Sequence, residues 1–271
     1  MVARAVTDYK CDFVAFTCAV IKAEVRYPNA TKSHLDYSFS VYIHPMIIGL
    51  LGKGGSGKST MATALVRGLR ARGMRVLAID ADHNMDLSYN LGAAPSLFLG
   101  SDPDRIKEHV GASRTGNFVE AARVGKKRGV EFTLWPADAF TSQTSVELED
   151  GLRLMVAGPH TDRVRLQMAC SHSLAAPLKT YLPLVHLKEG EVVIIDERAG
   201  CDPVATGILS GVDLAVIVQE HTVNSRRVAA QITHELDLAK VEYLIVENKI
   251  HGVETDTKHA IEKILSRMDK E

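Results

Sequence analysis

The stretch LLGKGGSGKST (residues 50–60) places glycines, lysines and hydroxyl side chains at a spacing that suits phosphate groups. Glycines allow the tight turns in which successive backbone N–H groups face an anion. Lys58 is expected to reach the outer phosphates of a nucleotide, and the Ser59 hydroxyl is expected to ligate Mg²⁺. The stretch therefore predicts a site for ATP with Mg²⁺. The residues predicted to contact the nucleotide are Gly52, Gly54, Gly55, Ser56, Gly57, Lys58, Ser59 and Thr60.

Further polar side chains stand where apolar runs end. Asp80 and Asp82 close one run, Asp196 closes a second, and Asn248 closes a third. Carboxylates at such places can hold Mg²⁺ or orient a water molecule, and a side-chain amide can both donate to and accept from an adenine edge. Two alternatives stay open: the aspartates Asp80 and Asp82 cap the next helix, and Asn248 ends a solvated strand.

The elements that must position these residues are visible as apolar patterns. Continuous apolar runs, typical of strands covered on both faces, occupy residues 46–51, 75–80, 191–196, 213–219 and 242–248. Helical spacing of apolar residues follows the glycine stretch, recurs at 225–239, and appears after Cys170 at Leu174, Leu178, Tyr181 and Leu182. The polar segment 100–150 is expected to form helix and loop excursions around a short strand near VEFTLWPA. Strands that alternate with helices predict an α/β fold with a doubly wound, mostly parallel sheet.

The segment KGGSGKS (53–59) carries a second lysine directly after the first glycine. It resembles the deviant phosphate loop of the MinD/ParA/nitrogenase-iron-protein superfamily of P-loop ATPases. The resemblance implies that Lys53 reaches across a homodimer to the phosphates held by the partner. There it would add positive charge where phosphoryl transfer develops negative charge. A solvated lysine on an exposed loop is the alternative.

Two more segments appear in the order that this superfamily shows. AIDADHNMDLSYNLG (78–92) is similar to the segment whose aspartate, here Asp82, orients or activates the attacking water. ENKI (247–250) resembles the adenine-reading segment, which implies that Asn248 contacts the base. Together with the phosphate loop, these segments extend the resemblance over about residues 46–250.

EVVIIDERAGCDP (191–203) resembles the Walker B strand and switch II of the same superfamily. The resemblance implies that Asp196 holds Mg²⁺ through water and that the Gly200 N–H faces the γ-phosphate. Slow ATP hydrolysis would then time a conformational cycle of the dimer.

Within the superfamily, LRLMVAG (152–158) followed by Cys170-Ser171-His172 resembles the CooC-type ATPases, which insert nickel into carbon-monoxide dehydrogenase. In that branch a Cys-x-Cys pair at this place meets its copy across the dimer axis. Here His172 replaces the second cysteine, so the resemblance implies two Cys170 and two His172 as ligands of Ni²⁺ or Zn²⁺. It also implies a client metalloenzyme similar to carbon-monoxide dehydrogenase.

Three alternatives to the metal pair stay open. Cys170 could be a small buried residue at a helix start, with His172 on the surface. Cys170 and Cys201 could serve an iron–sulfur electron-transfer ATPase that resembles the nitrogenase iron protein. The chain could also be a MinD/ParA-like positioning or scaffold ATPase. Its apolar stripe in HAIEKILSRM (259–268) is more typical of packing on the sheet than of a membrane anchor.

Composition narrows the classes of partner. The 271 residues carry a net charge of −1 and no long apolar run, which argues against nucleic acid and against stable membrane insertion. Four cysteines are too few for a disulfide scaffold, and a phosphate loop is typical of the cytoplasm. We expect residues 46–271 to form one P-loop ATPase domain that ends earlier than its relatives usually do. Residues 1–45 are expected to be an N-terminal extension of unknown role.

Overall fold

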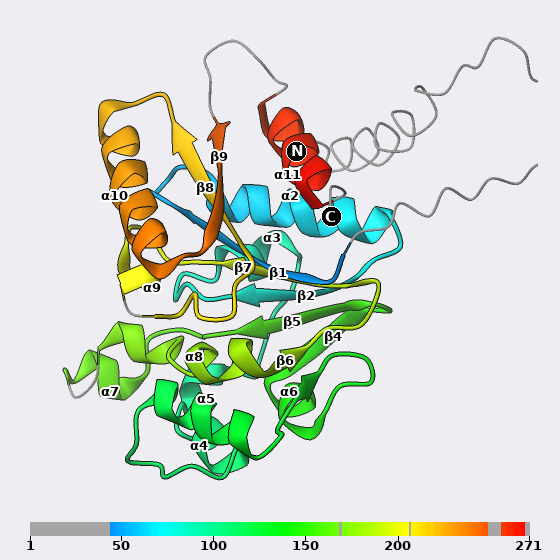
Figure 1. Cartoon of the computed structure of the whole chain (residues 1–271), viewed down its shortest axis with the longest axis vertical. Coiled ribbons are helices and arrows are strands. Elements are labelled where there is room, and N and C mark those ends of the chain that lie inside the picture. Colours follow the sequence, from blue (N-terminus) through cyan, green and yellow to red (C-terminus); the bar gives the residue numbers. More distant parts are fainter. Residues whose placement is uncertain (1–43, 168–169, 206, 249–255, 269–271) are drawn as a thin grey trace, which may run out of the picture.

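A seven-stranded sheet forms the centre of the computed structural model, which describes residues 44–167, 170–205, 207–248 and 256–268 (Figure 1). Neighbouring strands run parallel except at one edge, where β4 pairs antiparallel with β5. The predicted doubly wound α/β fold and its five predicted strands are confirmed. From edge to edge the strands are β4 (Ser145–Glu149), β5 (Leu152–Val156), β2 (Arg75–Asp80), β7 (Glu191–Asp196), β1 (Met46–Gly52), β8 (Leu214–Glu220) and β9 (Glu242–Asn248).

The strand order places a crevice at the carboxyl end of β1. After β1 the chain passes through α2 (Lys58–Ala71) to β2, which lies beyond β7, whereas β8 lies on the opposite side of β1. Such a reversal of strand order is where open α/β sheets bind ligands. The register sets Leu50 beside Asp196 and Asp196 beside Asp80, so the ends of three strands meet there.

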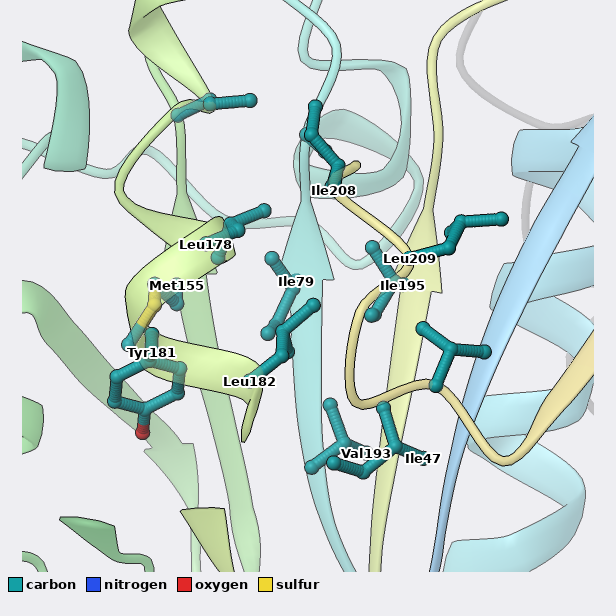
Figure 2. Close-up of a cluster of buried hydrophobic side chains, with 14 of the residues drawn as sticks. Ile47, Ile79, Met155, Leu178, Tyr181, Leu182, Val193, Ile195, Ile208 and Leu209 are labelled. Carbon is teal, nitrogen blue, oxygen red and sulfur yellow. The ribbon is translucent and has the colours of Figure 1, made fainter. Parts of the chain in front are cut away.

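Helices cover both faces of the sheet and bury two apolar clusters. On one face, α2 and α11 (Asp256–Met268) pack together over the strands, and the stripe Ile261, Ile264, Leu265 and Met268 is buried. This stripe therefore belongs to the core. On the other face lie α8 (Leu178–Tyr181), α9 (Asp202–Ala205) and α10 (Val223–Ala239). Figure 2 shows Ile79, Ile195 and Tyr181 within this second cluster. Among the described residues, no helix combines the length and hydrophobicity that a membrane crossing requires.

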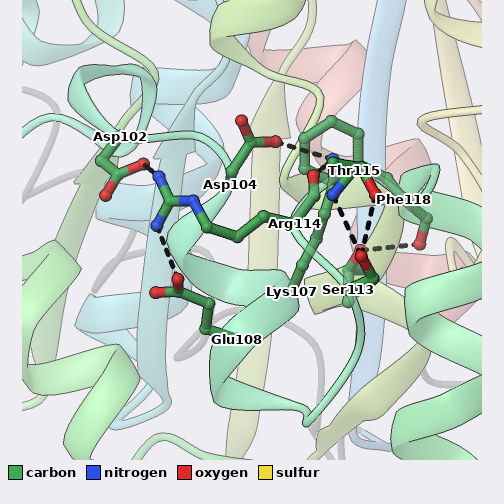
Figure 3. A network of polar contacts seen from close by, with 9 residues as sticks. Asp102, Asp104, Lys107, Glu108, Ser113, Arg114, Thr115 and Phe118 are labelled. Atoms are coloured by element: carbon green, nitrogen blue, oxygen red, sulfur yellow. Dashed lines mark hydrogen bonds and ion pairs between the residues drawn. The ribbon is translucent and has the colours of Figure 1, made fainter.

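A polar and helical insertion precedes β4, in agreement with the expectation of helix and loop excursions around a short strand. It begins after α3 (Asp86–Asn90) and contains η1 (Leu99–Ser101), α4 (Arg105–His109), α5 (Phe118–Lys127), β3 (Phe132–Thr133) and α6 (Ala139–Thr144). Lys107 holds its first half together: the buried ammonium pairs with Asp104 at 2.7 Å and lies 4.2 Å from the Phe118 ring centroid (Figure 3). Arg114 bridges Asp102 and Glu108 on the surface.

The segment after β5 is less regular than the sequence pattern predicts. In place of one helix after Cys170, the chain forms η2 (Ser171–Leu174), α8 and η3 (Leu182–Leu184), and then reaches β6 (Val185–His186). Pro177 and Pro183 explain the breaks, because proline lacks an N–H and clashes with the preceding turn. The apolar residues of the pattern, such as Leu178 and Tyr181, are nevertheless buried as expected. A short α7 (Asp162–Arg165) precedes the segment.

Candidate functional site

The glycine-rich loop joins β1 to α2 with a backbone that only glycine permits at two positions. Gly52 has φ +146°, and a Cβ on it would lie 2.4 Å from the Val218 carbonyl oxygen. Gly57 has φ +95°, and a Cβ there would lie 2.3 Å from the Asn248 amide nitrogen. A side chain would therefore clash with a neighbour as well as strain the backbone. The loop is held in one shape directly in front of the α2 N-terminus, where an anion is favoured.

Lys58 brings a buried positive charge to this loop. Its side chain is almost fully enclosed, and its ammonium donates to the Lys53 carbonyl at 3.3 Å. Burial lowers the pKa of Lys58, whereas nearby carboxylates, with Asp196 and Asp82 foremost, act in the opposite direction. The cation therefore sits within a group of acidic side chains, at the place where the sequence predicts phosphate binding.

The carboxylate of Asp196 fits a divalent cation. It is buried at the end of β7, and no hydrogen bond of good geometry reaches either oxygen among the described residues. Burial raises the pKa of Asp196 to about 7, although the Ser59 hydroxyl and the Lys58 charge lower it. A buried carboxylate without such bonds is costly unless a cation or donors satisfy it. Ser59 and Asp196 therefore form a donor pair suited to Mg²⁺, an ion that prefers oxygen ligands.

The two aspartates after β2 have different surroundings. Asp80 is fully buried and its Oδ2 accepts bonds from the N–H and the hydroxyl of Ser88 in α3, at 2.8 and 2.7 Å. Asp80 is therefore bonded to the first turn of α3, whose N-cap position is occupied by Met85. Asp82 lies beyond the strand end and keeps 21% of its side chain exposed. Its Oδ1 accepts a bond from the Asn84 N–H at 3.1 Å, so the predicted catalytic carboxylate is held yet open to solvent.

Switch II is tied to the phosphate loop in this conformation. The Gly200 N–H, which the sequence predicts to face the γ-phosphate, donates to the Gly52 carbonyl at 3.0 Å. Contact with a phosphate would require that bond to open. The adjacent Glu197 is a feature that the motif comparison misses: its carboxyl group is buried, with no hydrogen-bond partner among the described residues. Burial, followed by the charge of Asp196, raises the pKa of Glu197 to about 8.

Asn248 lies against the phosphate loop although the two are far apart in the sequence. Its amide Nδ2 donates to the Ser56 carbonyl at 2.9 Å, and the side chain is buried at the end of β9. The solvated-strand alternative is therefore wrong. The predicted contact with adenine stays a prediction, and the amide also has a structural partner in the loop.

The remaining loop residues that the sequence predicts to bind the nucleotide lie at the surface or close to it. Lys53 is half-buried, with its ammonium 3.4 Å from the neighbouring Gly54 carbonyl, and Thr60 is exposed. Gly55 has nothing within 4 Å of a Cβ built on it. Within the described part of the chain, the Lys53 side chain hydrogen-bonds only to its own loop.

The predicted metal pair is only partly described. Cys170 is exposed at the start of η2, whereas the side chain of His172 lies outside what the structure describes. No group of three or more histidine, cysteine or acidic side chains suited to a metal ion occurs in the described part of the chain. Cys201 is half-buried and packs against the core.

Comparison with known proteins places the chain in a family. The family model for the CobQ/CobB/MinD/ParA nucleotide binding domain matches residues 47–265. The chain belongs to this family. The match covers most of the predicted domain and includes the phosphate loop, the Walker B strand and β9. The prediction of a P-loop ATPase of the MinD/ParA superfamily is confirmed.

Two individual proteins are similar to this chain over most of its length. The chain is 32% identical over 188 residues to the carbon monoxide dehydrogenase accessory protein CooC of Rhodospirillum rubrum, covering 69% of this chain and 67% of that protein. It is 31% identical over 222 residues to an uncharacterised ATP-binding protein of Methanocaldococcus jannaschii, covering 80% and 82%. Among solved structures, the cell division ATPase MinD of Pyrococcus furiosus aligns with a TM-score of 0.49 and 22% identity, over 82% of this chain and 80% of that chain.

Proposed function

We propose that this ATPase is a cytoplasmic metallochaperone that inserts nickel into a metalloenzyme similar to carbon-monoxide dehydrogenase. The observation that carries the proposal is the 32% identity to CooC, a carbon monoxide dehydrogenase accessory protein, combined with an exposed Cys170 at the place where the CooC-type motif begins. The ATPase domain comprises residues 46–271, and residues 1–43 lie outside the described part of the chain. The working form is a homodimer.

Nucleotide binding rests on the loop between β1 and α2. Its N–H groups and Lys58 bind the phosphates of ATP, and the Asn248 amide meets the adenine base while it supports Ser56. Ser59 and Asp196 hold Mg²⁺, which neutralises charge on the phosphates when it is bound. Asp82 orients the attacking water, because its carboxylate is fixed at Oδ1 and open to solvent.

The conformational cycle uses the contact between the loop and switch II. In the conformation described here, the Gly200 N–H donates to Gly52. ATP competes for this N–H through its γ-phosphate, and switch II then moves away from the loop. Lys53, whose side chain hydrogen-bonds only to its own loop among the described residues, completes the site of the partner subunit. Hydrolysis is slow because it times opening and closing of the dimer.

Metal binding requires both subunits. One chain supplies Cys170 and His172, two ligands, and two-fold symmetry doubles them to the four that a tetrahedral N/S site needs. Opening of the dimer after hydrolysis separates the two pairs and releases the ion to the client.

Metal stoichiometry tests this function directly. Protein purified without oxygen is titrated with Ni²⁺ or Zn²⁺, with and without ATP, and the bound metal is counted. About one ion per dimer is expected, lost in Cys170→Ala and kept in the matched control Cys201→Ala. Metal binding that is unchanged in Cys170→Ala contradicts the proposed site. Bound iron with a brown colour that requires Cys170 and Cys201 indicates the electron-transfer alternative instead.

A further inference from the structure

Two imidazole rings stack where two loops leave the sheet side by side. The rings of His83 and His160 have centroids 4.2 Å apart and are only 17° from parallel. His83 follows Asp82 after β2, and His160 lies on the loop after β5. These strands are neighbours in register, and the Ala157 N–H donates to the Asp80 carbonyl at 2.8 Å at the point where they end. The stack therefore joins segments that the sheet has already brought together.

One ring of this pair touches the carboxylate that the proposed mechanism uses. The Nδ1 of His83 lies 3.2 Å from Oδ1 of Asp82, a close contact without the geometry of a hydrogen bond. The Asn84 N–H donates to the same Oδ1, so these two contacts with the described residues fall on a single oxygen. The other oxygen, Oδ2, is left for a water molecule or a substrate.

The charge of His83 suits a positioning role. Burial lowers the pKa of His83 from its ordinary 6.5, Asp82 opposes this shift, and the charges of His160 and Arg198 add to it. The uncharged form of the ring is therefore favoured. Packed against Asp82, the ring restricts the movement of the carboxylate without cancelling the negative charge that would attract a proton from the attacking water.

The ring of His160 contributes to the pair by stacking on His83. The Nε2 of His160 is buried without a hydrogen-bond partner among the described residues, so the ring is not held there by a bond from that nitrogen. Beside it lies a cavity of about 100 Å³, lined among others by Phe98, Ala157 and Thr161. His160 therefore supports His83 from one side, and the cavity leaves room for a slightly larger ring.

We propose that His83, held in place by its stack on His160, positions the Asp82 carboxylate for the attacking water in ATP hydrolysis. The inference rests on the proposed function, because it takes Asp82 as the group that orients that water. It adds two positioning residues that no phosphate-loop motif contains. Both lie outside the loop that binds ATP, so they act on turnover and not on affinity.

The test compares His160→Ala with the matched control His160→Phe in steady-state ATP hydrolysis. Alanine removes the stack, so kcat is expected to fall about ten-fold while KM for ATP stays within about two-fold, because a misplaced group costs rate and not binding. Phenylalanine keeps a stacked ring, and the cavity accommodates it, so kcat is expected to recover to within about three-fold of the wild type. Equal losses in both variants, or a change in KM alone, would overturn the proposal.

Two further variants keep the outcome interpretable. If His160→Ala does not fold, His83→Ala replaces it and is expected to lower kcat to a similar extent, whereas wild-type kcat in that variant refutes the inference. Asp82→Asn separates the inference from the proposed function. Full activity in Asp82→Asn removes Asp82 from the mechanism, and the inference with it. Loss of activity in Asp82→Asn but not in His160→Ala overturns the positioning role alone.

Discussion

Replacing Asn248 with alanine removes the one side-chain bond that joins β9 to the phosphate loop. The amide donates to the Ser56 carbonyl at 2.9 Å, and the side chain is only 7% exposed. Leaving a buried carbonyl without its partner costs about 1–3 kcal/mol. If the loop must keep this shape to bind phosphates, ATP affinity should fall roughly 5- to 150-fold. Asn248→Asp should lose more, because a carboxylate would then face the Ser56 carbonyl.

Calorimetric titration with ATP and with inorganic tripolyphosphate, which has no base, separates two roles of Asn248. A residue that supports the loop should weaken the binding of both ligands when it is removed. A residue that only reads adenine should affect ATP alone. Glu247→Gln is the matched control, since this neighbouring side chain is 47% exposed and contacts His221, not the loop. Tripolyphosphate affinity within two-fold of the wild type in Asn248→Ala would refute the support role.

Three further predictions follow from the same site. Gly57→Ala should abolish ATP binding in an equilibrium titration, because φ is +95° and the new Cβ would meet the Asn248 nitrogen, whereas Gly55→Ala, with open space around it, should bind ATP with a smaller loss. Lys53→Ala should bind ATP normally but lose most of its hydrolysis rate, and a wild-type rate would exclude the role of Lys53 in the partner's site. Glu197, whose pKa rises from 4.5 to about 8 on folding, keeps its proton in the folded state, so its contribution to stability is full below pH 4.5 and is lost as pH rises through 8. Denaturant unfolding between pH 5 and 8 should show this decline, by at most about 1.4 kcal/mol per pH unit, and Glu197→Gln should reduce it.

The central part of the fold could be predicted because its sequence signals are local. Strands covered on both faces need continuous apolar runs, and the runs at β1, β2 and β7 have almost the predicted bounds. The phosphate loop is equally local, since its glycines and Lys58 lie within seven residues of one another. Only the order in which these strands pair depends on distant parts of the chain. The preference for right-handed crossover connections predicts most of that order.

The segments that escaped prediction have weak or conflicting signals in the local sequence. The antiparallel β4 contains Glu147 and Glu149 at exposed positions and alternates like a solvated edge strand, a weak signal within a polar insertion. The helix expected after Cys170 is broken at Pro177 and Pro183, where the proline signal outweighs the apolar spacing.

Missing site residues have the same origin. In the sequence, Glu197 resembles an ordinary polar residue after a strand. Only the structure shows that its carboxyl group is buried without a hydrogen-bond partner among the described residues. The stack of His83 on His160 joins residues 77 positions apart, so no spacing within one motif indicates it. The bond from Asn248 to Ser56 spans 192 residues. In each case the residue is present in the sequence, but its contacts depend on the pairing register of the strands.

The same register places the loops of the nucleotide site, and the segment of the proposed metal site, at one edge of the sheet. β1, β7, β2 and β5 are consecutive neighbours, and their carboxyl ends lead into the phosphate loop, switch II, the Asp82 loop and the segment that reaches Cys170. The contacts that cross between these loops include the Gly52–Gly200 bond and the His83–His160 stack. In the proposed cycle, a phosphate that draws Gly200 away breaks the first of these contacts. Both contacts involve loops that the proposed mechanism uses for ATP. A link between the nucleotide and the Cys170 segment therefore needs no path through the core. It needs only that neighbouring loops share one edge.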